Sequence, residues 1–219
     1  MCIRDSLQAQ INPHFLFNTL NAGAQLSMME GADRTYEYIQ KVAQFYRYNM
    51  KKSEETVTIA EEVEMVDSYI YILNVRFAGD IHYEKHIDEA LLSVEMPGMI
   101  LQPIVENCVN HGIREMGDKG VIVLSLYEKE GRVCISVKDN GVGMSEETIQ
   151  KVLCGTYREE DMASGGNGVG MDNVISRMKL FTDDENVITV RSEEGKGTEV
   201  CFYLQRTGQP EKGGNDGPL

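Results

Sequence analysis

The spacing of apolar residues changes from a helical period to a strand period part-way along the chain. Between Ile59 and Phe77, apolar side chains recur at alternating intervals of four and three residues, which predicts a helix packed along another helix. Further along, the stretches VIVLSLYEKEGRVCISVKDNGVG and NVITVRSEEGKGTEVCFYLQ alternate and are predicted to form two β-hairpins. Helices are expected at residues 145–153 and 170–180. We therefore predict an α+β protein, a helical region followed by an α/β layer sandwich.

The first third of the chain is predicted to be helical from Leu7 to about Phe77. The segment before the heptad pattern places Ile39, Val42, Ala43, Tyr46 and Met50 on one face, and the polar run KKSEET separates the two segments. A helical bundle or hairpin is expected. The run FAGD is the expected boundary between a helical region at 1–79 and a second domain at 80–205. Residues 206–219, rich in Gly and Pro, are expected to form a disordered tail.

Composition narrows the class of protein and its partners. With 219 residues, 42% hydrophobic and 26% charged, the chain can bury a core and resembles ordinary globular proteins. Its net charge of −14 argues against nucleic acid or an anionic membrane surface as a partner. The five cysteines include no C-x-x-C pair, which disfavours a zinc site or a disulfide framework and fits a reducing cytoplasm.

The N-terminal residues do not have the apolar core of a signal peptide, and no apolar run approaches the ~18 residues that a membrane span requires. The chain begins inside a predicted helix without a capping residue. We therefore expect a fragment of a longer protein, in which residues 1–6 need not be native.

The segment QPIVENCVNHGIRE, at residues 102–115, is predicted to be a helix with one apolar face and one amide-rich face. The apolar face comprises Leu101, Ile104, Val105, Cys108 and Gly112. Asn107, Asn110 and His111 lie on the other face, where Lys and Glu would be usual for a solvated surface. An Asn oxygen suits Mg²⁺, which bridges to phosphates. An ordinary polar surface is the alternative.

Three glycine-rich segments follow this helix. In DNGVGM, at 139–144, the glycines permit a ligand to approach the backbone, and Asp139 can accept a hydrogen bond from an exocyclic amine. GGNGVGMDNVISRM, at 165–178, places glycines directly before a predicted helix, as anion-binding loops do. Together with Gly155, its first glycines flank a polar segment that is expected to be a mobile lid. GKGTEV, at 195–200, is the third.

Each glycine segment has a plainer alternative. DNGVGM resembles a hairpin turn, although a helix and not a strand is predicted after it. The second segment resembles a dinucleotide-binding loop, although no parallel β-α-β unit surrounds it. GKGTEV alone predicts only a tight turn. The order of the four segments, each beside a suitable secondary-structure element, makes chance agreement improbable.

Pro13 immediately precedes His14 in a stretch with helical spacing. A proline in a helix interior costs roughly 3 kcal/mol, because it removes a hydrogen bond and collides with the carbonyl four residues back. We interpret Pro13 as a bend that exposes the His14 imidazole, with Asn18 one turn later on the same face. A histidine packed inside a helical bundle is the alternative.

Together these features resemble a known family. The Asn-bearing helix and the three glycine segments resemble the N, G1, G2 and G-T elements of the ATPase domain shared by histidine kinases, type II topoisomerases, Hsp90 and MutL. INPHFLFNTLN and LQPIVENCVNHG are more specific, and are similar to the LytS/YesM-type sensor histidine kinases of bacterial two-component systems. The resemblance covers roughly residues 7–204.

The resemblance implies that His14 is phosphorylated with ATP and Mg²⁺ and passes the phosphate to an aspartate of a response regulator. It implies that Asn107 binds Mg²⁺, that Asp139 holds the adenine amine, and that Asn18 positions water for dephosphorylation of the regulator. The further nucleotide-binding residues that it implies are Asn110, His111, Gly141, Gly143, Met144, Gly166, Gly168, Gly170, Met171 and Thr198. It also implies a homodimer, at the cytoplasmic face of the cell membrane in a longer, membrane-anchored parent.

The sequence departs from the family pattern at two positions. Phe15 follows His14 where many histidine kinases have an acidic residue, so Glu106 is the candidate general base. Asn110 stands where relatives often have Lys, and His111 is expected to supply part of that phosphate contact. Two other functions remain as alternatives, an ATPase of this fold acting as a serine kinase and a non-catalytic dimerisation or binding module.

Overall fold

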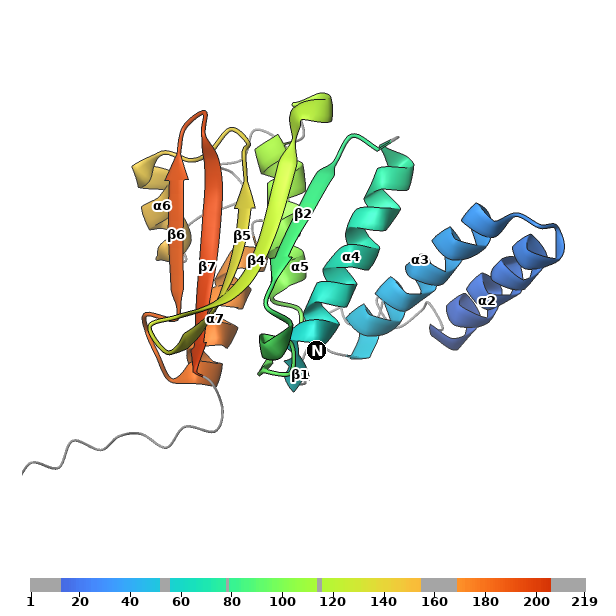
Figure 1. Cartoon of the computed structure of the whole chain (residues 1–219), viewed down its shortest axis with the longest axis horizontal. Coiled ribbons are helices and arrows are strands. Elements are labelled where there is room, and N and C mark those ends of the chain that lie inside the picture. Colours follow the sequence, from blue (N-terminus) through green and yellow to red (C-terminus); the bar gives the residue numbers. More distant parts are fainter. Residues whose placement is uncertain (1–12, 52–55, 78, 114–115, 155–168, 206–219) are drawn as a thin grey trace, which may run out of the picture.

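The computed structural model describes residues 13–51, 56–77, 79–113, 116–154 and 169–205. The predicted tail at 206–219 and the predicted lid at 155–166 lie outside these residues. The described part consists of a helical hairpin beside a layer of helices packed on a β-sheet (Figure 1).

The first two N-terminal helices form a hairpin that differs from the predicted pairing across KKSEET. Helix α2 (Pro13–Met29) packs along α3 (Asp33–Lys51), and α3 packs along α4 (Ile59–Arg76). Gly31 ends α2 with a left-handed φ of +69°, and the Ala32 N–H donates to the Ser27 carbonyl at 2.8 Å. The predicted helix from Leu7 onward had no break here, because apolar spacing alone does not show that Gly31 ends a helix.

Helix α4 joins the core of the sheet as well as the helical hairpin. Thr58 caps it in a reciprocal pair with Glu61, and the heptad residues from Ile59 to Leu73 are buried. They belong to the same hydrophobic cluster as residues of the sheet and of α5. Strand β1 (Thr56–Thr58), directly before α4, pairs antiparallel with β3 (Glu95–Pro97). The boundary at Gly79 and Asp80 stays a prediction, and Phe77, at the end of the heptad pattern, is 38% exposed.

A five-stranded sheet forms one layer of the molecule, with the order β2-β4-β5-β7-β6. Strand β2 (His82–Ile87) runs parallel to β4 (Val121–Lys129), and all other neighbours are antiparallel. The first predicted hairpin is β4 with β5 (Arg132–Asp139), and the second is β6 (Ile188–Glu193) with β7 (Gly197–Gln205). Both hairpin predictions are therefore confirmed.

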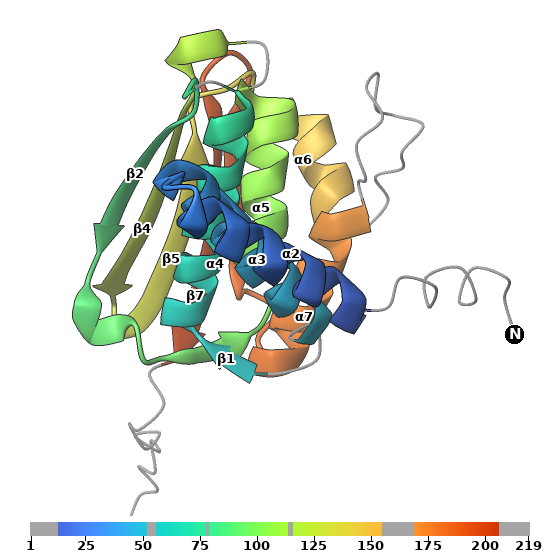
Figure 2. The same ribbon diagram turned by 90° about the vertical axis from the view of Figure 1, so that its right-hand side faces the viewer.

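Helices α5 (Leu101–Asn107), α6 (Glu146–Leu153) and α7 (Val169–Thr182) lie with α4 on the same side of the sheet (Figure 2). Short 3₁₀ turns at Glu89–Leu91 and Gly117–Lys119 connect the elements. Alternate residues of the strands, such as Leu124, Ile135 and Phe202, face these helices and are fully buried. The α+β prediction is confirmed, as a two-layer arrangement.

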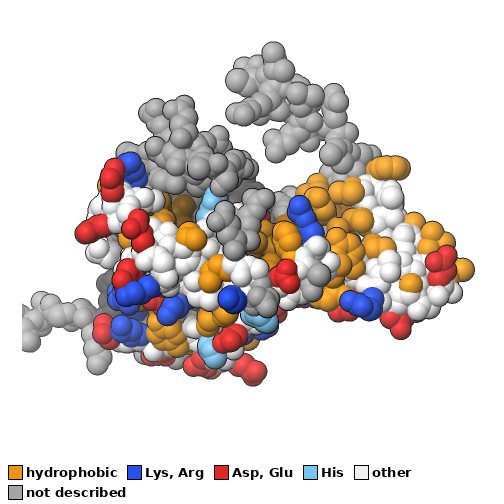
Figure 3. Space-filling view, turned by 90° about the horizontal axis from the view of Figure 1, so that it is seen from above, with side chains coloured by type: hydrophobic (Ala, Val, Ile, Leu, Met, Phe, Trp, Pro, Cys, Tyr) orange, Lys and Arg blue, Asp and Glu red, His pale blue; other side chains and the backbone are white. Residues whose placement is uncertain are grey.

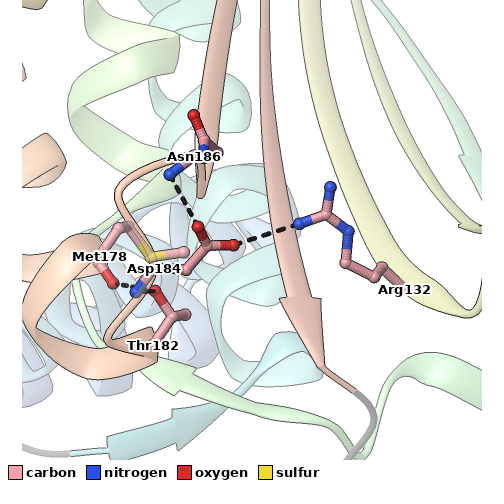
Figure 4. Close-up of polar contacts among 5 residues, drawn as sticks. All are labelled: Arg132, Met178, Thr182, Asp184 and Asn186. Carbon is pink, nitrogen blue, oxygen red and sulfur yellow. Dashed lines mark hydrogen bonds and ion pairs between the residues drawn. The ribbon is translucent and has the colours of Figure 1, made fainter. Parts of the chain in front are cut away.

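Arg132, at the start of β5, fixes the connection between α7 and β6. Its guanidinium lies 4.8 Å from the centroid of the Tyr203 ring on β7. It also bonds the Asp184 carboxylate at 3.2 Å, and Asp184 accepts from the Asn186 N–H at 2.8 Å, just before β6 (Figure 4). Arg132 thus ties the connection between α7 and β6 to the start of β5.

We expect a chain that starts at residue 56 to fold and one that starts at residue 80 to fail. The shorter chain lacks α4, whose Ile59 and Val66 are fully buried in the shared core. Each such side chain contributes roughly 1.5–3 kcal/mol, against a typical total stability of about 5–15 kcal/mol. Thermal unfolding followed by circular dichroism would test this, and equal cooperative transitions in the two chains would contradict it.

Candidate functional site

Asp139, the last residue of β5, is the centre of the candidate site. Its side chain is 3% exposed, and its Oδ1 accepts from the Gly141 N–H at 2.8 Å. The Thr198 N–H and the Cys108 thiol also donate to this carboxylate. Burial raises the pKa of Asp139, and the three donors oppose that shift. A carboxylate has about four acceptor positions, so capacity for one further donor remains.

Cys108 contacts the Asp139 carboxylate, a role that was not predicted from the sequence. Its side chain is buried, and burial together with the neighbouring carboxylate raises the pKa of the Cys108 thiol well above its usual value. The thiol therefore stays protonated and donates to Asp139.

The helix opposite Asp139 changes its pitch within the predicted segment. Residues Leu101–Asn107 are α-helical, and Cys108–Ile113 continue as a π-helix. A Cβ at Gly112 would lie 2.8 Å from Asp139 Oδ1, so this position has room only for glycine. The prediction of one uniform α-helix at 102–115 was wrong in this respect, because apolar spacing does not report a local widening; π-turns are often found at functional sites. Arg114 and Glu115 lie outside the described residues.

The loop at residues 139–144 is packed between the π-helix and the β6–β7 hairpin. A Cβ at Gly141 would lie 2.1 Å from the Gly112 carbonyl oxygen, and one at Gly143 would lie 2.0 Å from the Glu193 oxygen. Similarly, a Cβ at Gly197, whose φ is +97°, would lie 2.1 Å from the backbone carbonyl oxygen of Asp139. Gly141 and Gly143 were predicted to let a ligand approach the backbone; in the structure, the missing side chains of all three glycines also make room for neighbouring backbone.

Ser192 connects this loop to the hairpin that contains Thr198. The Met144 N–H donates to Ser192 Oγ at 2.8 Å, and Ser192 Oγ donates to the Gly197 carbonyl at 2.9 Å. The hydroxyl of Thr198 lies 2.8 Å from Ser192 Oγ. Ser192 thus joins Met144 to Thr198, whose N–H donates to Asp139.

The amide-rich face of α5 and the π-helix is the second part of the site. Asn107 and His111 are half-buried, and Asn110 is exposed. The Asn107 side chain has no hydrogen bond to another described residue. Glu106 Oε1 accepts from Gln102 Nε2 at 2.9 Å. Burial, followed by the charge of Glu106, raises the pKa of Tyr69 on α4.

Glu62, on α4, provides the N-terminal cap of α5. Its Oε2 accepts from the N–H groups of Ile100 and Leu101 at 2.8 Å each, and its Oε1 from Met99 at 2.6 Å. The cap position, Ile100, has no side-chain cap of its own. The sequence analysis missed Glu62. The feature that could have indicated its role is the position of Glu62, three residues after Ile59 and four before Val66, where helical spacing predicts a buried side chain.

His14 and Asn18 lie on α2, away from Asp139. The Asn18 Nδ2 is 3.2 Å from His14 Nδ1 and 3.4 Å from its Nε2, and both residues are exposed. Figure 1 places α2 on the outer side of α3, with α4 between α3 and the sheet. The structure therefore pairs His14 with Asn18 and does not bring either to Asp139 or Glu106. Pro13 would leave the carbonyl of Ala9 without a hydrogen-bond partner, but Ala9 lies outside the described residues.

The second glycine segment is described only from residue 169. Gly166 and Gly168 lie outside the described residues, and Gly170 is in the first turn of α7. Met171 is half-buried and packs against the hydrophobic core. Among the described residues, no three His, Cys, Asp or Glu side chains cluster as metal ligands, and no helix has the length and apolarity to cross a bilayer.

Comparisons with known proteins agree with the geometry. A family model described as histidine kinase-, DNA gyrase B- and HSP90-like ATPase matches residues 97–208, and a histidine kinase model matches residues 4–81. The solved catalytic domain of the histidine kinase ThkA has a TM-score of 0.53 at 18% identity, over 69% of this chain and 94% of that domain. That likeness concerns the fold alone.

Curated relatives share more of the sequence. Sensor histidine kinase YpdA of Escherichia coli is 36% identical over 92% of this chain, and sensor protein LytS of Oceanobacillus iheyensis is 32% identical over 91%. Sensor histidine kinase YesM of Bacillus subtilis is 29% identical over 91%. The chain spans 34%, 34% and 32% of the lengths of YpdA, LytS and YesM. The predicted resemblance is confirmed.

Gly112→Ala should destabilise the fold by roughly 1–3 kcal/mol, because the new methyl group overpacks against Asp139. Gly23→Ala is the matched control. That glycine lies inside α2, where a Cβ would be 3.5 Å from Ile39 Cδ1, an ordinary contact. The control should be neutral or more stable by roughly 0.5–1 kcal/mol. Urea unfolding of both variants would test the difference, and a Gly112→Ala variant as stable as the parent would refute the close contact.

Proposed function

Because the chain belongs to the histidine kinase-, DNA gyrase B- and HSP90-like ATPase family, we propose that it is the ATP-dependent catalytic core of a sensor histidine kinase. The observation that carries this proposal is the buried Asp139 carboxylate, which three protein donors leave with capacity for one more hydrogen bond. An adenine amine is a donor of the required kind. Gly141, Thr198 and Met144 would contact the same part of the nucleotide.

The residues present also fit a magnesium ion next to a triphosphate. Asn107 offers a half-buried amide oxygen with no described hydrogen-bond partner, and a single protein oxygen suffices for a cation that keeps several waters and binds phosphate. Asn110 and His111 lie on the same helical segment and would contact phosphate oxygens. The bound Mg²⁺ would neutralise charge that develops on the transferring phosphoryl group.

His14 is the proposed nucleophile. The nitrogen of a neutral imidazole that carries a lone pair would attack the γ-phosphorus, and the bond from that phosphorus to the β–γ bridging oxygen would break, leaving ADP. The proton on the other ring nitrogen would pass to solvent. Asn18 Nδ2 is within hydrogen-bond range of both ring nitrogens, but it donates to whichever one carries the lone pair. Asn18 therefore has to release His14 before the attack, after which it is placed to orient water or the aspartate of a response regulator.

The proposed assembly is a homodimer formed through the helical hairpin. Hydrophobic side chains gather over the end of the molecule that α2 and α3 form (Figure 3). They include Phe15, Met28 and Met29, which are 69%, 67% and 83% exposed. Exposed apolar surface of this kind marks an interaction site. A second copy on this surface would also let His14 meet the nucleotide site of a partner. The response regulator, the cytoplasmic location and the membrane-anchored parent stay predictions from the resemblance.

Incubation of the purified protein with γ-labelled ATP and Mg²⁺ tests the kinase directly. The expected product carries label that is lost in acid and stable in base, as phosphohistidine is. His14→Gln should carry no label and should still bind nucleotide, because α2 lies apart from Asp139. A serine kinase would instead give acid-stable label, and a non-catalytic binding module would give none.

Asp139→Asn should weaken nucleotide binding by roughly 1.5–3 kcal/mol, the worth of a hydrogen bond to a charged group. Titration calorimetry with ADP would measure it. Asp80→Asn, at an exposed position outside the site, is the control and should bind as the parent does. Equal affinity in the Asp139→Asn variant and the parent would remove the adenine assignment.

Light scattering should give the mass of a dimer at tens of micromolar, and a double substitution Met28→Gln with Met29→Gln should shift it toward the monomer. The substitutions remove exposed apolar surface from α2 without touching the core. A parent protein that is monomeric under these conditions would exclude the hairpin as a stable interface.

A further inference from the structure

A side chain from the helical hairpin contacts the carboxylate that caps α5. The Tyr48 hydroxyl, on α3, donates to Glu62 Oε1, the same oxygen that accepts from the Met99 N–H. Glu62 is fully buried, and burial followed by the Glu62 charge raises the pKa of Tyr48. Tyr48 therefore keeps its proton at physiological pH and remains a donor. Three elements, α3, α4 and α5, thus meet at a single carboxylate.

Two further contacts between α3 and α4 in the described part of the chain include no hydrogen bond to the start of α5. Gln44 Nε2 donates to Glu64 Oε1 at 2.7 Å, and the rings of Phe45 and Tyr69 stack with centroids 5.6 Å apart. These contacts hold the two helices together. The Tyr48 contact differs because Glu62, its acceptor, is itself bound to three backbone N–H groups at the start of α5.

The start of α5 depends on Glu62 to an unusual degree. Met99 has a left-handed φ of +58°, a costly conformation for a residue with a side chain. The free N–H groups of the first turn have no local cap, and the Glu62 carboxylate satisfies them while opposing the positive end of the helix dipole. Asn107 lies at the other end of the same α-helix. A shift of the carboxylate would therefore move the first turn and, with it, the rigid segment that carries Asn107.

We propose that Tyr48 and Glu62 are positioning residues for phosphoryl transfer, through which the placement of the α2–α3 hairpin is communicated to Asn107. The proposal rests on the proposed function, in which His14 on that hairpin is phosphorylated and Asn107 binds the metal ion. Tyr48 fixes the Glu62 carboxylate, and Glu62 fixes the first turn of α5. A movement of α3 that breaks the Tyr48 hydrogen bond would release the Glu62 carboxylate and with it the orientation of α5.

The variant Tyr48→Phe removes the hydroxyl and keeps the ring, and Tyr46→Phe is its matched control. Tyr46 lies on the same helix, is 46% exposed and has no described contact with Glu62. At saturating MgATP, Tyr48→Phe should label His14 at least roughly fivefold more slowly, because phosphoryl transfer tolerates little misplacement. Its affinity for ADP should stay within about twofold of the parent's, since Asp139 is untouched. Tyr46→Phe should match the parent in both respects.

A double-mutant cycle with Glu62→Gln tests whether Tyr48 acts through Glu62. If it does, the double variant should label no more slowly than Glu62→Gln alone, so the two effects would not multiply. A double variant whose loss of labelling rate equals the product of the two single losses would overturn the proposal. So would a Tyr48→Phe variant that melts at a lower temperature but labels at the parent's rate. If Glu62→Gln proves too unstable to purify, the comparison of Tyr48→Phe with Tyr46→Phe decides. A parent protein that binds ADP but does not label His14 would instead contradict the proposed function.

Discussion

The close approach of three backbone segments beside Asp139 is the constraint on which the rest of the site depends. The Val142 N–H donates to the Gly112 carbonyl at 3.1 Å, and the Val142 carbonyl accepts from the Gly195 N–H at 2.7 Å. Val142 thus links the π-helix, the loop after β5 and the β6–β7 hairpin. A side chain at Gly112, Gly141 or Gly197 would separate these segments. The enclosed carboxylate then needs donors from all three of them, which are the Cys108 thiol and the N–H groups of Gly141 and Thr198.

Much of this arrangement could be predicted from the order of short motifs. The alternation of apolar residues was sufficient to predict both hairpins, because a register error of one residue would turn Ile135 and Phe202 away from the helices. The position of Asp139 followed from its place at the end of a strand before a glycine pair. The motifs could not show why glycines occupy these positions, because close contact with a ligand and close contact with backbone both require a residue without a Cβ.

The remaining features depend on contacts between residues that are distant in the sequence. Glu62 and the N–H groups that it accepts from are more than 35 positions apart, and local spacing carries no information about such a pair. The parallel pairing of β2 with β4 requires a crossover through α5, which alternation within either strand does not report. The π-helix is a third case. Its extra residue per turn is dictated by the packing of Gly112 against Asp139 and not by the composition of the segment.

The strand order has a consequence for biosynthesis. Strand β7 is the last described strand, yet it lies between β5 and β6 and contributes the fully buried Phe202. On a ribosome, the β4–β5 hairpin can form early, but β6 has no neighbour to pair with until residues 197–205 have left the exit tunnel. The central part of the sheet is therefore completed late, and an apolar face remains open to chaperones, or to a second nascent chain, until β7 has been synthesised. Shortened products that end before β7 should consequently be degraded by proteases as unfolded protein.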